Sequence, residues 1–167
     1  MAAYDVTTAN SSLEFDTQYG QYNNCFCIDN NHFINFWSGN STRYGYVQVF
    51  TVNTSTWAVT TANSSLEYST STLDTIPSCY QIDGNHFINF WRGADADGYA
   101  QVFTVNTSTW EVTTAAAALE FDTKNCYEPS CYKIDDNHFI VFWGGGSAAY
   151  GYAQVFTVNT STWEVTT

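Results

Sequence analysis

The sequence predicts an all-β protein made of three similar units, each folded as four antiparallel strands. The first observation is a ten-residue string, QVFTVNTSTW, that occurs unchanged at Gln48–Trp57, Gln101–Trp110 and Gln154–Trp163, with 53 residues from one start to the next. The second is that the segments around it are rich in Phe, Val, Ile, Thr, Tyr and Trp over strand lengths. A fixed period of this kind indicates one structural unit repeated three times.

The strands follow one another in the same order within each unit. The first is predicted at CFCID, CYQID or CYKID, and the second at HFINFW or HFIVFW. Between them stand Asp29, Asn30 and Asn31 or their equivalents, which are residue types that close tight hairpins. The third strand is predicted at YVQVFTVN and the fourth at TWAVTT, with a hairpin tip at residues 53–55.

Helix is nearly absent from this prediction. The alanine-rich segment 115–120 occupies the position where the other units have polar AANSSLE-like sequence, so we expect it to be extended or irregular in spite of its helix propensity. The segments between the constant stretches vary in length and sequence. We expect them to be solvent-facing loops.

The apolar pattern of the strands helps to choose the architecture. In the segment 32–37, Phe33 and Trp37 point to one face, while Ile34 and Phe36 point to the other. Both faces are therefore expected to be covered, as in a blade stacked between two other blades of a β-propeller. The sequence thus predicts one domain, residues 1–167, of three propeller blades, with repeat units at about 4–56, 57–109 and 110–162.

The wording of the repeat also carries a resemblance. With IDNNHFINFW followed by GYVQVFTVNTSTW, the chain resembles β-propellers built from recently amplified, near-identical blades, similar to repeats of secreted bacterial and phage surface proteins. The tip TVNTSTW is similar to a shortened Asp-box hairpin of sialidase-type propellers, although the Asp and Gly of that motif are missing. The resemblance implies an extracellular location, or one on a cell or virion surface.

Three blades alone do not form the usual ring of four to eight. The segment 4–8 aligns with 57–61 and 163–167, so the same strand is expected at both termini, with 163–167 as the duplicate. We expect the chain to complete its fold with copies of itself, either as half of a six-bladed ring or in an open array. A β-trefoil, which also has three units of four strands, is the alternative fold.

Composition excludes several classes of partner. The formal net charge is −12, with sixteen acidic residues against four basic ones, so a nucleic acid would be repelled. No run of about 18 apolar residues exists, which excludes a helical membrane span.

The residues that could carry catalysis recur in every unit. His32, His86 and His138 each follow an Asp by three residues, and we expect each pair to fix its own hairpin. A singly occurring nucleophile is absent, and only two arginines are present where a sialidase-like reaction would need a cluster. We expect no enzyme activity, no metal and no cofactor. The segment 95–98, which has the residue types of a calcium loop, occurs only in the middle unit and is expected to be a solvated loop.

The sequence contains candidate sites for two covalent modifications. Cys126 and Cys131 could form a local disulfide in an oxidising compartment. Asn53, Asn106 and Asn159 lie in sequons on the predicted hairpin tips, which would be accessible for glycosylation in a eukaryotic secreted protein.

The aromatic residues give the remaining functional interpretation. Rings at strand ends beside polar loops can stack on sugars, and repetition would make binding multivalent. The candidate residues are Trp37, Trp91, Trp143, Tyr46, Tyr99 and Tyr152. The sequence therefore predicts a non-enzymatic, self-assembling structural module, with a multivalent carbohydrate-binding module as the alternative.

Overall fold

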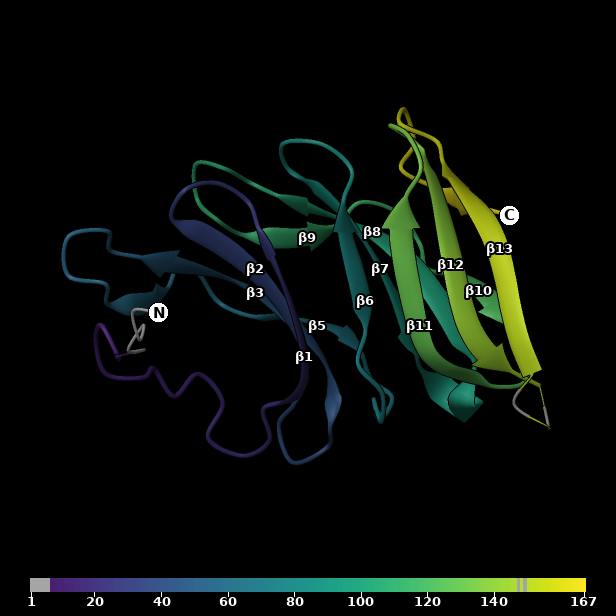
Figure 1. The fold of residues 1–167 in the computed structure, drawn as a ribbon, viewed down its shortest axis with the longest axis horizontal. Coiled ribbons are helices and arrows are strands. Elements are labelled where there is room, and N and C mark those ends of the chain that lie inside the picture. Colours follow the sequence, from purple (N-terminus) through teal and green to yellow (C-terminus); the bar gives the residue numbers. More distant parts are fainter. Residues whose placement is uncertain (1–6, 147, 149) are drawn as a thin grey trace, which may run out of the picture.

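The computed structural model describes residues 7–146, 148 and 150–167, and its described part consists of three antiparallel sheets. Figure 1 shows the sheets one after another from left to right, in the order of the sequence. We call them blades 1, 2 and 3. The prediction of an all-β chain of three antiparallel β-propeller blades is confirmed, and two of the blades have a short fifth strand in addition to the four predicted. The chain forms three separate sheets, one for each period of the repeat, which excludes the β-trefoil.

Blade 1 contains five strands in the order β1-β2-β3, followed by two short strands that both pair with β3. Their bounds are β1 Gln21–Cys27, β2 His32–Gly39, β3 Tyr44–Val52, β4 Val59–Thr61 and β5 Leu66–Ser69. The β4 strand pairs with the end of β3, and β5 pairs with its beginning. The outermost strand of the blade is therefore split into two pieces.

Blade 2 repeats this arrangement, and blade 3 has four strands. The strands of blade 2 are β6 Ser78–Gln81, β7 His86–Arg92, β8 Gly98–Val105, β9 Val112–Thr114 and β10 Leu119–Asp122, with one short 3-10 turn, η1, at Ala94–Ala96. The strands of blade 3 are β11 Cys126–Lys133, β12 His138–Gly145, β13 Tyr150–Val158 and β14 Val165–Thr166.

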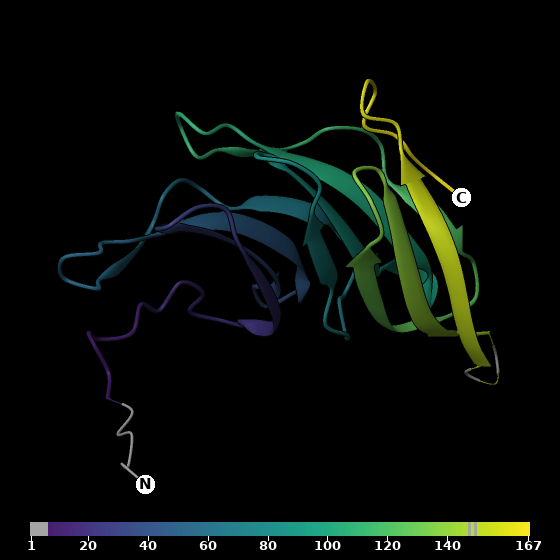
Figure 2. The same ribbon diagram turned by 45° about the horizontal axis from the view of Figure 1, so that its top comes forward.

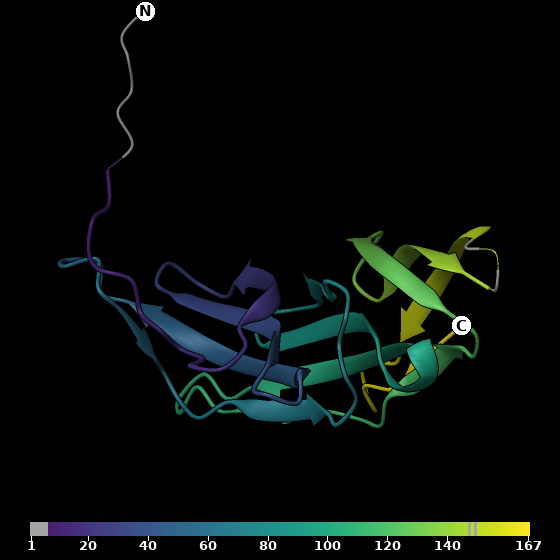
Figure 3. The same cartoon turned by 90° about the horizontal axis from the view of Figure 1, so that it is seen from below.

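The first strands of the blades, β1, β6 and β11, lie next to one another and form the inner side of the array. The Cys79 amide donates to Asn24 Oδ1 over 3.1 Å, and the Cys131 amide donates to Ser78 Oγ over 2.8 Å. These two hydrogen bonds join neighbouring inner strands. Figures 2 and 3 show blade 2 between the other two from further directions.

Two hydrophobic cores fill the spaces between the blades. The core between blades 1 and 2 is built from one face of each, including Ile34, Phe36, Phe87 and Phe103. The core between blades 2 and 3 has the equivalent composition, including Phe90 and Phe156. The expectation from the strand pattern, that both faces of a blade are apolar and covered, therefore holds for the middle blade.

Some features differ from the sequence predictions. The strands β5 and β10 are not among the four strands predicted for each unit, and two residues of the variable segments are not solvent-facing. Leu73 and Cys126 are fully buried, and the Leu73 amide donates to the Arg43 carbonyl over 2.8 Å. The alanine-rich segment 115–120 contains no helix, which agrees with the prediction that it is extended or irregular.

The sheets are offset from the repeat units predicted from the sequence, because the strand after each QVFTVNTSTW tip closes the preceding blade. At the N-terminus, the segment 4–8 lies mostly outside the described residues, and Thr7 and Thr8 are not in a strand. At the other end, β14 pairs with β13 as β4 pairs with β3. No described helix is long and apolar enough to cross a membrane.

Candidate functional site

Each blade has two unlike faces, and the contacts between blades always join one kind of face to the other. We call the face with Ile34, Phe36 and their equivalents the downstream face, and the face with Phe33, Phe50 and their equivalents the upstream face. The downstream face of blade 1 packs on the upstream face of blade 2. Blades 2 and 3 pack in the same way. The chain therefore contains two examples of one interface.

An aromatic residue from the segment between two blades lies at the centre of each interface. The Tyr68 ring is 5.8 Å from that of Phe36 on blade 1, and 5.1 Å from the Trp91 ring and 5.5 Å from the Phe103 ring on blade 2. In the second interface, Phe121 contacts Phe90, Trp143 and Phe156 with similar edge-to-face geometry. Such pairs add about 0.5–1.5 kcal/mol to the energy of burial.

A glycine on the third strand makes room for this aromatic. A Cβ added to Gly45 would lie 2.7 Å from the Tyr68 ring, and one added to Gly98 would lie 2.7 Å from the Phe121 ring. Only glycine lets these rings lie against the strand. The same segment pairs its backbone with that strand, since β5 pairs with β3 and β10 with β8.

A histidine and a tryptophan close each interface at its outer side. The rings of His32 and Trp110 are stacked with centroids 3.5 Å apart, and those of His86 and Trp163 are 3.6 Å apart. Each tryptophan follows a hairpin tip and has a positive φ, 61° for Trp110 and 62° for Trp163. A bulky residue in this conformation is strained. Stacking on the histidine can offset that cost.

The histidines are held by the hairpin aspartates, as the sequence predicts. Asp83 accepts hydrogen bonds from the His86 amide, the Asn85 amide and His86 Nδ1 at 2.9 to 3.0 Å. Burial alone would raise the pKa of Asp83, but these hydrogen bonds outweigh it and lower that pKa. The pKa of Asp29 is lowered in the same manner. The spacing in the sequence predicts these Asp–His pairs but not the tryptophans stacked on them. The identity of the three hairpin tips is the signal in the sequence that could have indicated a role for these tryptophans.

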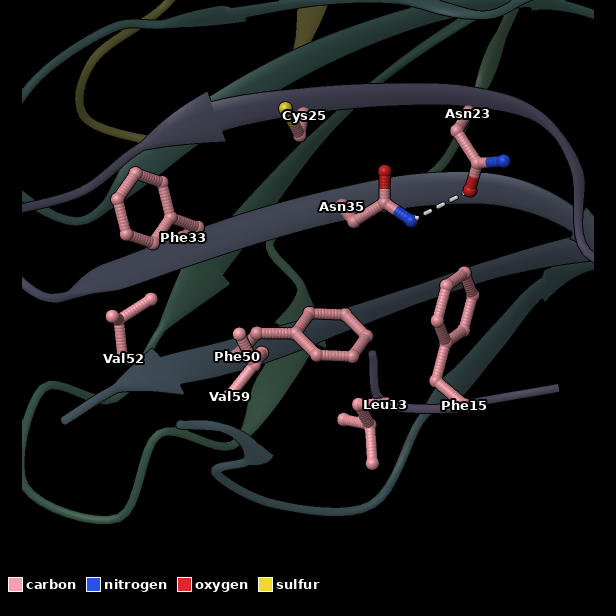
Figure 4. Close-up of a pocket in the computed structure, with 9 residues that line it drawn as sticks. All are labelled: Leu13, Phe15, Asn23, Cys25, Phe33, Asn35, Phe50, Val52 and Val59. Carbon is pink, nitrogen blue, oxygen red and sulfur yellow. Dashed lines mark hydrogen bonds between the residues drawn. The ribbon is translucent and has the colours of Figure 1, made fainter. Parts of the chain in front are cut away.

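At the two ends of the array, one half of this interface is present without the other. The upstream face of blade 1 forms an apolar hollow of about 530 Å³, shown in Figure 4. Phe15 already lies on it, with ring distances of 5.2 Å to Trp37 and 5.3 Å to Phe50. The lining residues are Leu13, Phe15, Asn23, Cys25, Phe33, Asn35, Phe50, Val52 and Val59.

The downstream face of blade 3 is the complementary open surface. Phe142 is 52% exposed, whereas Phe36 and Phe90 at the same position of the other units are fully buried. Val155 is exposed as well, although Val49 and Val102 are buried. A hollow of about 500 Å³ lies here beside Tyr127, Phe142 and Gly151. The described structure thus leaves two unlike apolar faces open.

The predicted sugar-binding aromatics lie together in pairs, but their surfaces are not equally accessible. The three tryptophans are buried, and each indole stacks on the tyrosine of its own unit at 5.6 to 5.8 Å. Tyr46 lines a partly polar notch of about 340 Å³ with Asp16, Gln18 and Asn40. The edge of Trp37 donates from Nε1 to Asp16 over 3.1 Å. The tyrosines, not the indoles, therefore offer accessible ring surface.

The predicted modification sites have clear structural positions. Cys126 and Cys131 both lie in β11, are free thiols and pair with different residues of β12. Five positions along a strand span about 16 Å, far beyond the reach of a disulfide, so the Cys126–Cys131 bridge does not form in this fold. Burial raises the pKa of each of the two thiols to about 12.

The sequon asparagines Asn53, Asn106 and Asn159 lie at exposed hairpin tips. Each side-chain oxygen accepts a hydrogen bond from the amide two residues later over 2.9 Å. These asparagines therefore shape the turns that present the tryptophans.

The described residues contain no group of three or more His, Cys, Asp or Glu side chains that could hold a metal ion. The 3-10 turn η1 overlaps the start of the segment 95–98. The loop is closed by a hydrogen bond from the Gly93 amide to the Asp97 carbonyl over 2.9 Å. On the inner strands β1, β6 and β11, Glu128 is the one acidic residue.

Comparisons with known proteins bear on the fold. No protein-family model and no curated protein matches the sequence. Among solved structures, nineteen chains match, including a variant of the GH32 beta-fructofuranosidase of Bombyx mori in complex with sucrose. That chain is 12% identical, with a TM-score of 0.50, and the match covers 86% of the present chain but only 36% of the enzyme. The GH32 enzyme has a β-propeller domain, so the likeness supports the propeller architecture.

Proposed function

We propose that this chain is a non-catalytic structural module that completes its β-propeller by associating with further copies of itself. The observation that carries the proposal is the exposure of Phe142, 52%, at a position that is fully buried in the two preceding units. Full burial of a phenylalanine is worth about 1.5–3 kcal/mol. The open faces of blades 1 and 3 together present several such residues, and extended apolar patches mark interaction surfaces.

The distribution of acidic groups supports a non-catalytic role. Glycoside hydrolysis, the chemistry of the structural neighbour, uses a pair of carboxyl groups on either side of the bond that is cleaved. Glu128 is the one carboxylate on the described inner strands, and it has no acidic neighbour there. The other groups with chemical potential, the Asp–His pairs, occur three times and support turns.

The acidity of the chain affects the conditions of association. Two copies, each with a formal net charge of −12, repel each other at long range. Because the open faces are apolar, association depends on burial and not on ion pairs. We therefore expect it to strengthen with moderate salt, which screens the repulsion.

Sedimentation analysis over a range of protein concentrations tests this function. The wild-type chain, 18.7 kDa, should form a species of higher mass, and Phe142→Asp should remain a monomer with an unchanged circular dichroism spectrum. The matched control is Thr107→Asp, at the exposed hairpin tip of blade 2, which carries neither open face. A wild-type chain that stays monomeric at all concentrations and salt levels would exclude the proposal.

A second candidate function, multivalent carbohydrate binding, is favoured by the notch beside Tyr46. There, an aromatic ring lies beside the carboxylate of Asp16 and the amides of Gln18 and Asn40, a combination that suits sugar hydroxyls and a sugar face. Glycan-array binding by the wild-type chain that is lost in a Tyr46→Ala, Tyr99→Ala and Tyr152→Ala triple variant would support it. Binding that the triple variant retains would exclude these tyrosines.

A further inference from the structure

Resting on the proposed self-association, we infer that copies of this chain join head to tail, with the downstream face of blade 3 receiving the upstream face of blade 1 of a second copy. The register is that of the two interfaces inside the chain. In this arrangement, Phe15 of the second copy lies on Phe142, its segment 13–16 pairs with the start of β13, and its Trp57 stacks on His138.

An empty space beside Gly151 on β13, which we call the Gly151 slot, is the first feature that indicates this contact. Gly151 occupies the position of Gly45 and Gly98, but a Cβ added to it would meet nothing within 4 Å. In the other two units, this space is filled by Tyr68 or Phe121. The equivalent aromatic of the repeat is Phe15, which already packs on the upstream face of blade 1. The slot and the ring that fits it therefore lie on opposite ends of the array.

The unpaired edge of β13 gives the second step. In blades 1 and 2, a strand with the sequence LEYS or LEFD pairs with the start of the third strand. In the described part of blade 3, β14 pairs only with Thr157 and Val158, near the end of β13. Residues 13–16 also read LEFD, and in the structure they are in no strand. A second copy can therefore supply the missing strand with the same sequence.

Side-chain hydrogen bonds agree with this pairing. Tyr46 donates from its hydroxyl to Glu67 over 2.6 Å, across the β3–β5 pair. The equivalents at the open ends are Tyr152 and Glu14 of a second copy. Gln101 donates to the Ala116 carbonyl over 2.7 Å, and its equivalent Gln154 would donate to the Asn10 carbonyl of the second copy. The contact thus pairs polar groups as well as rings.

The outer stack gives the third step. The side chain of His138 is 40% exposed, whereas those of His32 and His86 are each 13% exposed under their tryptophans. Trp57 is 55% exposed and keeps the strained positive φ of 59°, with no stacked ring among the described residues. Within the described part of the chain, His138 on blade 3 and Trp57 on blade 1 therefore each lack the stacked ring that their equivalents have.

A symmetric contact between two identical faces does not satisfy these groups. Two downstream faces would set one Gly151 slot against another, with no ring to fill either. Two upstream faces would bring Phe15 against Phe15 and leave both tryptophans without a histidine. The complementary parts meet only when unlike faces meet, which is a heterologous interface.

The test uses two variants, each blocked at one end. Gly151→Gln fills the slot on blade 3, and Phe15→Gln removes the ring that would enter it. Neither changes the net charge. Gly84→Gln is the matched control, because Gly84 also has nothing within 4 Å of an added Cβ but lies in a hairpin away from the open faces. Circular dichroism checks the fold of each variant, and Trp57→Gln replaces Phe15→Gln if that variant does not fold.

Native mass spectrometry of the separate and mixed variants then gives the result. We expect each blocked variant alone to associate about 30-fold more weakly than wild type, the effect of losing a central aromatic contact. An equimolar mixture should form a 1:1 pair and nothing larger, because one unblocked contact remains. The control should assemble as wild type does, either into a two-chain ring or into an open series.

Different failures point to different parts of the account. If the wild-type chain assembles but either blocked variant assembles as tightly alone, the head-to-tail arrangement is wrong while self-association stands. If the blocked variants do not pair when mixed, the register is wrong. A monomeric wild-type chain overturns both the arrangement and the proposed function.

Discussion

Phe36 and Phe142 occupy the same position in two units of nearly identical sequence, yet one is fully buried and the other is half exposed. The same contrast holds between the upstream faces, where Phe87 is fully buried and the equivalent Phe33 is only partly so. The units do not differ in their capacity to pack; they differ in whether a neighbour is present. In a repeat array, burial is a property of the interface between units more than of the unit itself.

Substitution of the equivalent phenylalanines should give the largest difference in stability between a covered face and an open face. Phe90→Ala removes a fully buried ring from the second core, and we expect it to lower the free energy of unfolding by about 3–5 kcal/mol. Phe142→Ala, on the open face, should cost the unassociated chain less than about 1 kcal/mol. Urea unfolding at low protein concentration measures both. Equal losses would show that the open face is covered in the monomer.

The tryptophans allow a smaller and more selective comparison. Trp110→Asn removes the stack on His32 and should destabilise the chain by about 1 kcal/mol. Asparagine tolerates the positive φ at this position better than tryptophan does, but it does not replace the lost stacking contact. Trp57 has no stacked partner among the described residues, so Trp57→Asn should be neutral or stabilising. Thermal unfolding of dilute samples distinguishes the two. A destabilising Trp57→Asn would indicate a contact within the chain.

A polar position inside the array sharpens the contrast between covered and open faces. On the open face of blade 1, Asn35 donates to Asn23 over 2.9 Å (Figure 4). The equivalent Asn89 is fully buried, and neither side-chain polar atom has a partner among the described residues. The third unit has Val141 there. Asn89→Val should raise the free energy of unfolding by about 1 kcal/mol, and an Asn35→Val variant, measured in parallel, should not.

Acid should weaken the hairpins that carry the histidines. The pKa values of Asp29 and Asp83 are lowered in the fold, despite some burial, by hydrogen bonds from the hairpin amides and histidines. Their contribution is therefore present above the ordinary carboxyl pKa of about 3.9 and is lost as the pH falls through the lowered values. Asp83→Asn should reduce the loss of stability that occurs as the pH falls below about 5. Denaturant titrations at each pH measure the free energy of unfolding. If this free energy falls with pH equally steeply in the variant and the wild-type chain, the assignment to Asp83 is contradicted.

Much of the fold follows from the sequence because the repeat removes ambiguity. Three copies of HFINFW and QVFTVNTSTW fix the strands, and the two apolar faces of residues 32–37 indicate stacked blades. The sequence does not indicate the segment LEYS as a strand, because four residues give little pattern and the pairing of this segment with β3 depends on contacts distant in sequence. The burial of Leu73 does not follow from the sequence either, because it depends on contacts with a segment distant in sequence, such as the hydrogen bond from its amide to the Arg43 carbonyl.

The candidate site was predicted less completely than the fold. The need for a partner follows from the number of blades, but the residues that would meet the partner do not. Trp57 and His138 are far apart in the sequence, and their relation becomes visible only when His32 is seen to stack on Trp110 in the structure. The tryptophans chosen as sugar platforms are buried for a related reason, since their strand-end position is covered by Tyr68, Phe121 and Phe15.

Amide hydrogen exchange at residues 150–153 of β13 tests the central claim most directly. In this segment, some amides point away from β12 and have no strand partner in the described structure. At concentrations where the chain is assembled, these amides should be as well protected as the equivalent amides of residues 45–47, which pair with β5. After dilution to the monomer, the protection of 150–153 should disappear while that of 45–47 remains. Exchange of 150–153 at the same rate in both states, with the mass still increasing, would show that the copies meet through another surface.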